Sequence, residues 1–260
     1  MLPLHTDNKF SFEKFDLEGF SVIVWLPPDY HYHGKPKYPV FFMNDGQNLF
    51  DSSTSFSGVA WEADITAEKM IKNNEIESFI IVGICNRGEK RIYDYAPFKD
   101  KNRNDGGGAH EYLKFLIDKL IPLIRQKYRV KIKPENNAIG GSSLGGLFSL
   151  WAAYENPKIF GKAAVISPAL WWNDNKIINL IRERKGIKLW IDMGKKEGEI
   201  IPEMNNPTKS TRMLVQKLQQ LGYSPSSFIY KEYENGEHNE KSWAERFPEI
   251  LKFLFPYKVN

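Results

Sequence analysis

The sequence predicts an α/β fold with a mostly parallel central sheet, helices on both faces and an antiparallel strand pair at the N-terminal end. Two observations predict it. Short apolar runs rich in β-branched and aromatic residues recur along the chain, and stretches with helical spacing separate them. Most runs from the second onward are continuously apolar, which suits strands covered on both faces. Alternation of this kind favours parallel strands joined by right-handed crossovers.

Each expected element comes from its own apolar pattern. The expected strands are Phe20 to Trp25, Pro39 to Met43, Phe79 to Ile84, Ala138 to Gly140, Ala163 to Ile166, Leu189 to Met193 and Phe228 to Tyr233, with the antiparallel pair around Phe10 to Trp25. The expected helices carry the stripes Leu113 to Tyr128, Leu147 to Glu155, Ser210 to Gly222 and Trp243 to Leu251. The stretch from Asn86 to Gly108 is the longest expected irregular loop, and such loops often border a site.

Composition favours one globular domain over residues 1–260, because this length can bury a sizeable core without dividing. The 36 Lys and Arg and 32 Asp and Glu are interleaved, so the net charge of +4 indicates a mixed surface and argues against nucleic-acid binding. No run approaches the ~18 apolar residues of a membrane span, and the first ten residues lack the apolar stretch of a secretory signal. We therefore expect no membrane partner and a cytoplasmic location.

The single cysteine and the histidine pattern limit the chemistry. Cys85 lies in an apolar run and has no second cysteine to pair with, so we expect a buried structural thiol. No His or Cys cluster has the spacing of metal ligands, which argues against a metal-dependent hydrolase. We expect neither a metal nor another cofactor.

A glycine-flanked serine follows one short strand and precedes a helix. In a strand-to-helix elbow the central serine has a strained backbone, and residues two before and two after it must be small. Only Ser143, with Gly141 and Gly145, meets this condition, because Ser142 has Leu144 two residues on. The pattern predicts that Ser143 is a nucleophile. The alternative is a glycine-rich turn in which the serine only caps the helix.

A serine hydroxyl needs a base, and that base needs a carboxylate to orient it. In an elbow of this type the chain order is serine, acid, histidine. His238 is the only histidine after Ser143, and it lies in a turn that follows the strand Phe228 to Tyr233. Bases of this kind lie in loops at the carboxyl ends of strands. We therefore predict His238 as the base, with a surface turn histidine as the alternative.

The acid is expected in the loop after the strand Leu189 to Met193, again at a carboxyl end. Glu197 is the first choice. Asp192 falls within the strand and is expected to point into the sheet or a covering layer, and Glu199 lies further out, so they rank second and third. A solvated charged loop is the alternative.

Two backbone N–H groups are expected to form the oxyanion hole. One belongs to Leu144, the residue after the nucleophile, and the other to the loop after the strand Pro39 to Met43. In that loop Asp45 and Gly46 permit a sharp turn that would direct the N–H of Gln47 toward the site, although an ordinary tight turn has the same sequence.

Four segments together resemble the putative esterase family, which includes esterase D-like, enterochelin esterase-like and feruloyl or acetyl carbohydrate esterases. The segments are Asp45 to Asp51, Gly140 to Gly146, Ser167 to Trp172 and Gly236 to Asn239. The resemblance extends from about Phe20 to Leu254. It implies an α/β-hydrolase fold, a triad of Ser143, Glu197 and His238, and cofactor-free ester hydrolysis. Many relatives have Asp where this chain has Glu197.

Four aromatic residues are candidates for a substrate pocket. Trp171 and Trp172 follow Ser167 and Pro168 at a strand end, and with Trp61 and Phe50 they could wall an acyl or aromatic group. Packing in the core is the alternative for each of them.

The function expected from these patterns is hydrolysis of a small-molecule carboxylic ester through an acyl-enzyme on Ser143. Transfer of the acyl group to an alcohol other than water is the neighbouring alternative. From a different class, the chain could be a catalytically inactive binding protein with the same fold.

Overall fold

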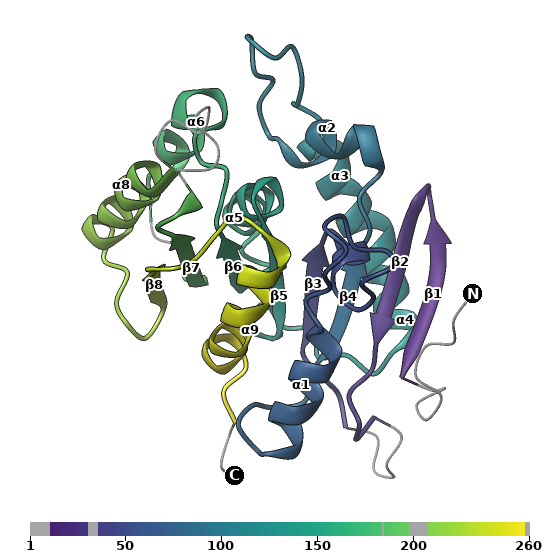
Figure 1. The fold of residues 1–260 in the computed structure, drawn as a ribbon. Coiled ribbons are helices and arrows are strands. Elements are labelled where there is room, and N and C mark those ends of the chain that lie inside the picture. Colours follow the sequence, from purple (N-terminus) through teal and green to yellow (C-terminus); the bar gives the residue numbers. More distant parts are fainter. Residues whose placement is uncertain (1–10, 31–35, 184, 198–206, 258–260) are drawn as a thin grey trace.

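The computed structural model describes residues 11–30, 36–183, 185–197 and 207–257, which form an α/β structure around one eight-stranded sheet (Figure 1). The strand order is β1-β2-β4-β3-β5-β6-β7-β8. The strands are β1 (Phe12–Leu17), β2 (Phe20–Trp25), β3 (Val40–Asn44), β4 (Ile80–Ile84), β5 (Asn137–Ser142), β6 (Lys162–Ile166), β7 (Lys188–Gly194) and β8 (Phe228–Tyr233). All seven expected strands are present, with ends shifted by no more than two residues.

The antiparallel pair at the N-terminal end is also confirmed. β1 and β2 are antiparallel, β2 is antiparallel to β4, and every pairing from β4 to β8 is parallel. Glu18 and Gly19, both with positive φ (49° and 84°), form the two-residue turn of the hairpin. This conformation matches the twist of a tight hairpin, and glycine adopts it without a steric cost.

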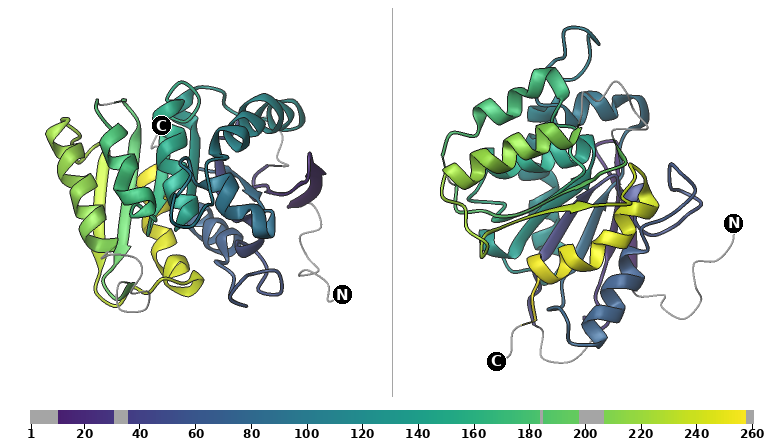
Figure 2. Two further views of the ribbon diagram at one scale, coloured as in Figure 1. Left: turned by 90° about the horizontal axis from the view of Figure 1, so that it is seen from above. Right: turned by 60° about the vertical axis from the view of Figure 1, so that its left-hand side comes forward.

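Helices cover both faces of the sheet (Figure 2). The helices are α1 (Ala63–Lys72), α2 (Arg91–Tyr95), α3 (Ala109–Phe115), α4 (Ile121–Lys127), α5 (Leu144–Glu155), α6 (Trp172–Leu180), α8 (Pro207–Gln220) and α9 (Glu240–Leu254). α1 and α9 pack on one face, whereas α3, α4, α5 and α8 pack on the other. Two apolar cores therefore enclose the parallel strands, as their continuously apolar sequences require. Within the described ranges, no helix has the length and apolarity needed to cross a membrane.

Two segments differ in detail from expectation. The stretch from Asn86 to Gly108 is not wholly irregular, because it contains a 3₁₀ turn (Gly88–Lys90) and the short helix α2. The stripe from Leu113 to Tyr128 is divided between α3 and α4 by a π-helical turn, Leu116–Leu120, and keeps its buried face. Periodicity identified the buried face there but not the change in hydrogen bonding.

Cys85 is free and only partly buried, just beyond the end of β4. Burial is the main cause that raises the pKa of its thiol to about 11. A thiol with such a pKa holds its proton at neutral pH and is a poor nucleophile. The expected structural role is compatible with this position, although the side chain is less enclosed than predicted.

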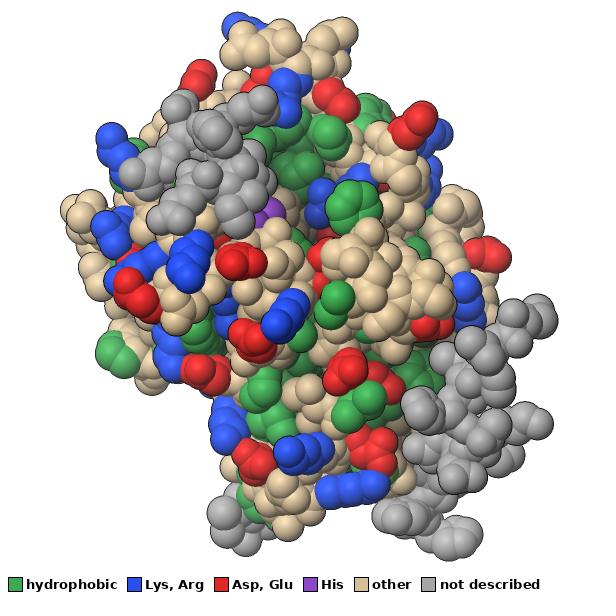
Figure 3. Space-filling view, viewed as in Figure 1, with side chains coloured by type: hydrophobic (Ala, Val, Ile, Leu, Met, Phe, Trp, Pro, Cys, Tyr) green, Lys and Arg blue, Asp and Glu red, His purple; other side chains and the backbone are tan. Residues whose placement is uncertain are grey.

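Charged side chains of both signs are interleaved over the face seen in Figure 3. Ion pairs at the surface of the described residues include Lys252 with Glu75 and Arg212 with Glu232. This face carries no continuous basic track, in line with the mixed surface expected from the sequence.

Candidate active site

Ser143 occupies a strained turn between β5 and α5. Its φ of 58° and ψ of −122° lie in a region that residues with a side chain seldom adopt. A Cβ added to Gly141 would lie 3.0 Å from the carbonyl carbon of Gly145, so the turn requires a very small residue at this position. The turn has the backbone form that the sequence predicted for a nucleophile.

Glu197 and His238 form a hydrogen bond at the carboxyl ends of β7 and β8. The distance from His238 Nδ1 to Glu197 Oε2 is 2.9 Å. Glu197 is fully buried and the side chain of His238 is 11% exposed. An ionised carboxylate can only accept, so Nδ1 donates and the neutral ring keeps Nε2 as an acceptor for another proton.

The second oxygen of Glu197 is fixed from several directions. Oε1 accepts hydrogen bonds from the Ser167 hydroxyl at 2.6 Å and from the backbone N–H of Gly194 at 2.7 Å. The guanidinium of Arg246, on α9, lies 3.3 Å away. These contacts leave Oε2 facing the imidazole, so the carboxylate has one outward-facing acceptor.

Asp192 does not face His238. It is buried within β7, where it accepts hydrogen bonds from Arg246 at 2.9 Å and from the indole N–H of Trp190 at 2.7 Å. Burial raises the pKa of its carboxyl to about 6, against the opposing effect of Arg246. This placement inside a covering layer is the one the sequence predicted. Glu199, the third candidate, lies outside the described residues.

Hydrogen bonds between strand ends bring Ser143 to the same edge of the sheet as the Glu197–His238 pair. The backbone N–H of Ser143 donates to the carbonyl of Ile166, the last residue of β6, at 3.0 Å. The next residue, Ser167, donates to Glu197. Among the described residues, no hydrogen bond is recorded between the Ser143 hydroxyl and His238. The structure thus brings the three residues to one edge and directly joins two of them.

The loop after β3 turns sharply at Asp45, which has a left-handed backbone (φ 58°). The carboxylate of Asp45 accepts two hydrogen bonds from Arg91, both at 2.8 Å, and one from the side chain of Asn86 at 2.7 Å. A Cβ on Gly46 would lie 2.5 Å from the backbone of Gly83, so the loop packs directly on β4. The loop is therefore held in one conformation from two sides.

The two expected oxyanion donors are the backbone N–H groups of Gln47, in the loop after β3, and of Leu144, at the start of α5. The N–H groups of Gln47 and Leu144 have no acceptor in the part of the chain that the structure describes. The side chain of Gln47 is occupied, because its oxygen accepts from the backbone N–H of Asn86 at 3.1 Å. Backbone donors without an internal partner are available to an external anion.

The four aromatic candidates fall into two groups. Trp61 is 3% exposed and packs against Trp243, with ring centroids 6.1 Å apart; Trp172 is 2% exposed and donates its indole N–H to Phe98 at 2.7 Å. Trp171 and Phe50 are only partly buried. Trp61 and Trp172 therefore pack in the core, and Trp171 and Phe50 retain accessible surface.

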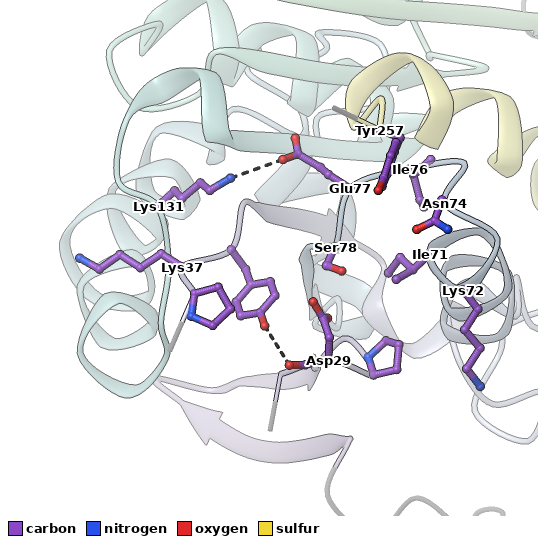
Figure 4. Close-up of a pocket in the computed structure, with 13 residues that line it drawn as sticks. Asp29, Lys37, Ile71, Lys72, Asn74, Ile76, Glu77, Ser78, Lys131 and Tyr257 are labelled. Carbon is purple, nitrogen blue, oxygen red and sulfur yellow. Dashed lines mark hydrogen bonds and ion pairs between the residues drawn. The ribbon is translucent and has the colours of Figure 1, made fainter. Parts of the chain in front are cut away.

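A separate cavity of about 600 Å³ lies between the segments that precede β3 and β4 (Figure 4). Lys131 reaches across it to Glu77, at 3.4 Å. Because the triad candidates follow the carboxyl ends of parallel strands, this cavity lies at the other end of the sheet and belongs to a different part of the molecule.

Sequence reasoning missed three buried polar residues around the site: Arg246, Ser167 and Asn44. A signal existed for Arg246, because it lies three residues after Trp243, within the apolar stripe of α9. Asn44 links the elements of the elbow, since its amide donates to the carbonyl of Gly140 at 3.1 Å and to the hydroxyl of Ser149 at 3.0 Å. No sequence pattern distinguished Asn44 or Ser167 from ordinary strand-end residues.

The chain is similar to other known proteins over most of its length. It is 25% identical over 240 residues to the uncharacterized protein YbbA of Bacillus subtilis, covering 89% of this chain and 91% of that one. It is also 25% identical over 239 residues to an endo-1,4-beta-xylanase/feruloyl esterase of Xylanibacter ruminicola, covering 89% of this chain and 29% of that protein. The siderophore hydrolase EstA from Aspergillus nidulans has the same fold, with a TM-score of 0.74, 18% identity and coverage of 97% and 98%.

The fold and the family that the sequence matches define a carboxylic ester hydrolase with an α/β-hydrolase architecture. The sequence profile of the family described as "Putative esterase" matches residues 18–254. The chain belongs to that family.

Proposed function

We propose that the protein is a serine esterase that hydrolyses small-molecule carboxylic esters through an acyl-enzyme on Ser143. One observation carries the proposal: the buried Glu197 carboxylate accepts from His238 Nδ1 at 2.9 Å, at the sheet edge where Ser143 occupies its strained turn. This arrangement orients the imidazole so that Nε2 can accept a proton. A histidine that served only the surface would not need a buried carboxylate partner.

In the proposed reaction His238 Nε2 takes the proton of the Ser143 hydroxyl as its oxygen attacks the ester carbonyl carbon. The carbonyl π electrons move to the oxygen, which becomes an anion stabilised by the N–H groups of Leu144 and Gln47. Collapse of this intermediate breaks the bond to the alcohol oxygen, which takes the proton from His238. Water, deprotonated by the same nitrogen, then releases the acid and regenerates Ser143.

Two aromatic side chains are the candidates for the substrate-facing wall. Trp171 lies two residues after Ala169, whose backbone N–H donates to the carbonyl of Ser143 at 3.0 Å. This hydrogen bond holds the segment that carries Trp171 close to Ser143. The guanidinium of Arg103 lies 5.2 Å from its ring centroid. Phe50, which follows the loop that carries Gln47, is the second candidate. Trp172 packs against Trp171, with ring centroids 5.9 Å apart, and Trp61 is buried in the core.

Relatives give the substrate classes to test. They include a protein named siderophore triacetylfusarinine C esterase, from Aspergillus fumigatus, and the endo-1,4-beta-xylanase/feruloyl esterase of Xylanibacter ruminicola. A side-by-side assay of aryl, acetyl-sugar and fatty-acyl esters would identify the preferred acyl group. A preference for aryl esters that disappears in Trp171→Ala would support the proposed wall.

The central experiment is hydrolysis of p-nitrophenyl acetate by Ser143→Ala, with Ser142→Ala as the matched control. Ser142 is the neighbouring serine, and its side chain lies in β5. We expect Ser143→Ala to lower kcat/KM at least roughly a thousandfold, and Ser142→Ala to stay within about tenfold of the unmodified protein. Labelling by a fluorophosphonate probe should also depend on Ser143. Full activity in Ser143→Ala would rule out the proposed nucleophile.

A further inference from the structure

Arg246 lies behind the triad candidates and is almost fully buried, at 2% exposure. Its guanidinium donates to Asp192 at 2.9 Å and to the Ser167 hydroxyl at 3.0 Å, and it lies 3.3 Å from Glu197 Oε1. It also covers the ring of Tyr233, 4.9 Å from the centroid. Together these contacts fix the position of the Arg246 guanidinium.

Two glycines make room for this guanidinium. A Cβ on Gly236 would lie 2.2 Å from Arg246 Nη2, and one on Gly194 would lie 2.6 Å from the same atom. Gly194 ends β7, ahead of Glu197, and Gly236 lies just ahead of His238. Both loops that carry the acid and the base therefore close around the arginine.

Pairing with Asp192 alone does not account for this placement. A salt bridge between β7 and α9 would need only Asp192 and Arg246, yet the guanidinium also approaches the triad carboxylate with both of its terminal nitrogens. Two fully buried carboxylates share one cation here. Removing that cation would leave both without a compensating charge, at a high cost in a desolvated site.

We propose that Arg246 is a positioning residue: it holds Glu197 Oε1, together with Ser167 and Gly194, so that Oε2 faces His238 Nδ1, while Asp192 holds the guanidinium in place. Its effect on rate rests on the proposed esterase function. Its effect on the Glu197–His238 hydrogen bond does not.

The test compares Arg246→Met, Asp192→Asn and the double variant. Asp192→Asn removes the negative charge but keeps an oxygen that can accept from Trp190. The double variant therefore removes one buried cation and one buried anion together. Arg246→Met should lower kcat on p-nitrophenyl acetate roughly a hundredfold with KM within about threefold, as expected when a catalytic group is misplaced by about 1 Å. The double variant should recover much of the lost thermal stability. It should not recover kcat.

A second readout does not need turnover. In the proton NMR spectrum, the Nδ1 proton of His238 should appear far downfield when it bonds to Glu197, and this signal should disappear in Arg246→Met and in the double variant. Arg246→Lys keeps the charge and should recover part of kcat. Arg212→Met, which removes an exposed arginine paired with Glu232, is the control and should change neither signal nor rate.

Two results would overturn the proposal. One is a double variant that regains both stability and the kcat of Asp192→Asn, because Arg246 would then serve only to balance Asp192. The other is an unchanged His238 signal in folded Arg246→Met or, where that variant does not fold, in the folded double variant. If the unmodified protein hydrolyses no ester, the esterase proposal fails, and the NMR signal still tests the positioning role.

Discussion

Replacing Glu197 by glutamine tests the acid of the triad most directly, because the surroundings of the side chain determine which way the amide turns. Oε1 is surrounded by donors: the Ser167 hydroxyl, the Gly194 N–H and the Arg246 guanidinium. The amide oxygen of Gln must therefore occupy the Oε1 position. Its NH₂ group then faces His238 Nδ1 at the 2.9 Å site of Oε2.

This orientation reverses the hydrogen bond. An NH₂ group donates, so Nδ1 must accept, and the neutral imidazole then carries its proton on Nε2. A protonated Nε2 cannot take the proton of the Ser143 hydroxyl. In a serine protease triad, the corresponding acid-to-amide change lowers kcat about ten-thousandfold, which corresponds to about 5.4 kcal/mol in the activation barrier. We expect Glu197→Gln to lower kcat/KM on p-nitrophenyl acetate by about the same factor.

The assay should be accompanied by a stability measurement, since Glu197 is fully buried. Circular dichroism and urea unfolding would show whether the variant keeps its fold. Asp94→Asn is the matched control, because it makes the same kind of chemical change in a buried carboxylate that pairs with Arg87 and has no hydrogen bond to Glu197, Arg246 or His238. Activity of folded Glu197→Gln within about tenfold of the unmodified protein would refute the reasoning, and would move the search for the acid to another residue.

Two further predictions concern stability. The pKa of Asp192 is raised to about 6 in the folded protein from an ordinary 3.8, so ionisation of this carboxyl opposes folding. Relative to Asp192→Asn, the unmodified protein should therefore lose up to about 3 kcal/mol of unfolding free energy as the pH rises from 4 to 7. If urea titrations gave the same difference between the two proteins at both pH values, this prediction would be contradicted. Asn44→Ala should lower the unfolding free energy by roughly 2 to 4 kcal/mol, because it leaves the Tyr112 hydroxyl and the Gly140 carbonyl without the Asn44 side chain as their buried partner. The control, Asn73→Ala at an exposed position, should have little effect in the same urea titration.

The sequence was sufficient to predict the strands and to choose Ser143 and His238, because these depend on local pattern and chain order. Ser143 has glycines at both required positions, and His238 is the only histidine that follows it. Apolar runs located every strand expected from the sequence because parallel strands covered on both faces have few polar residues. The Asn86 to Gly108 stretch was harder, because a five-residue helix such as α2 is too short to show a period.

The sequence ranked Glu197 above Asp192 as the candidate acid, because Glu197 follows the expected strand and Asp192 lies within it, but it contained no information on what each carboxylate contacts. Both are fully buried, but Glu197 contacts His238 whereas Asp192 contacts Arg246 and Trp190. The same is true of Arg246: its place in the apolar stripe of α9 indicated burial, but its partners come from segments about 50 and 80 residues earlier in the chain. Charge pairs of this kind are long-range contacts, and local spacing contains no information about them.

The length of the glutamate side chain is compatible with the proposed role of Glu197 as the acid. Glu197 lies three residues beyond the end of β7, and its carboxylate folds back to accept the N–H of Gly194, the last residue of that strand. With one oxygen fixed to the end of its own strand, the other still reaches His238 on the loop after β8. An aspartate is shorter by one methylene, about 1.5 Å of reach, so at the same backbone position it could not keep both contacts. Gly194, Gly236 and Arg246 thus pack around the Glu197 carboxylate, and in the proposed site the longer side chain lets one oxygen stay fixed while the other reaches His238.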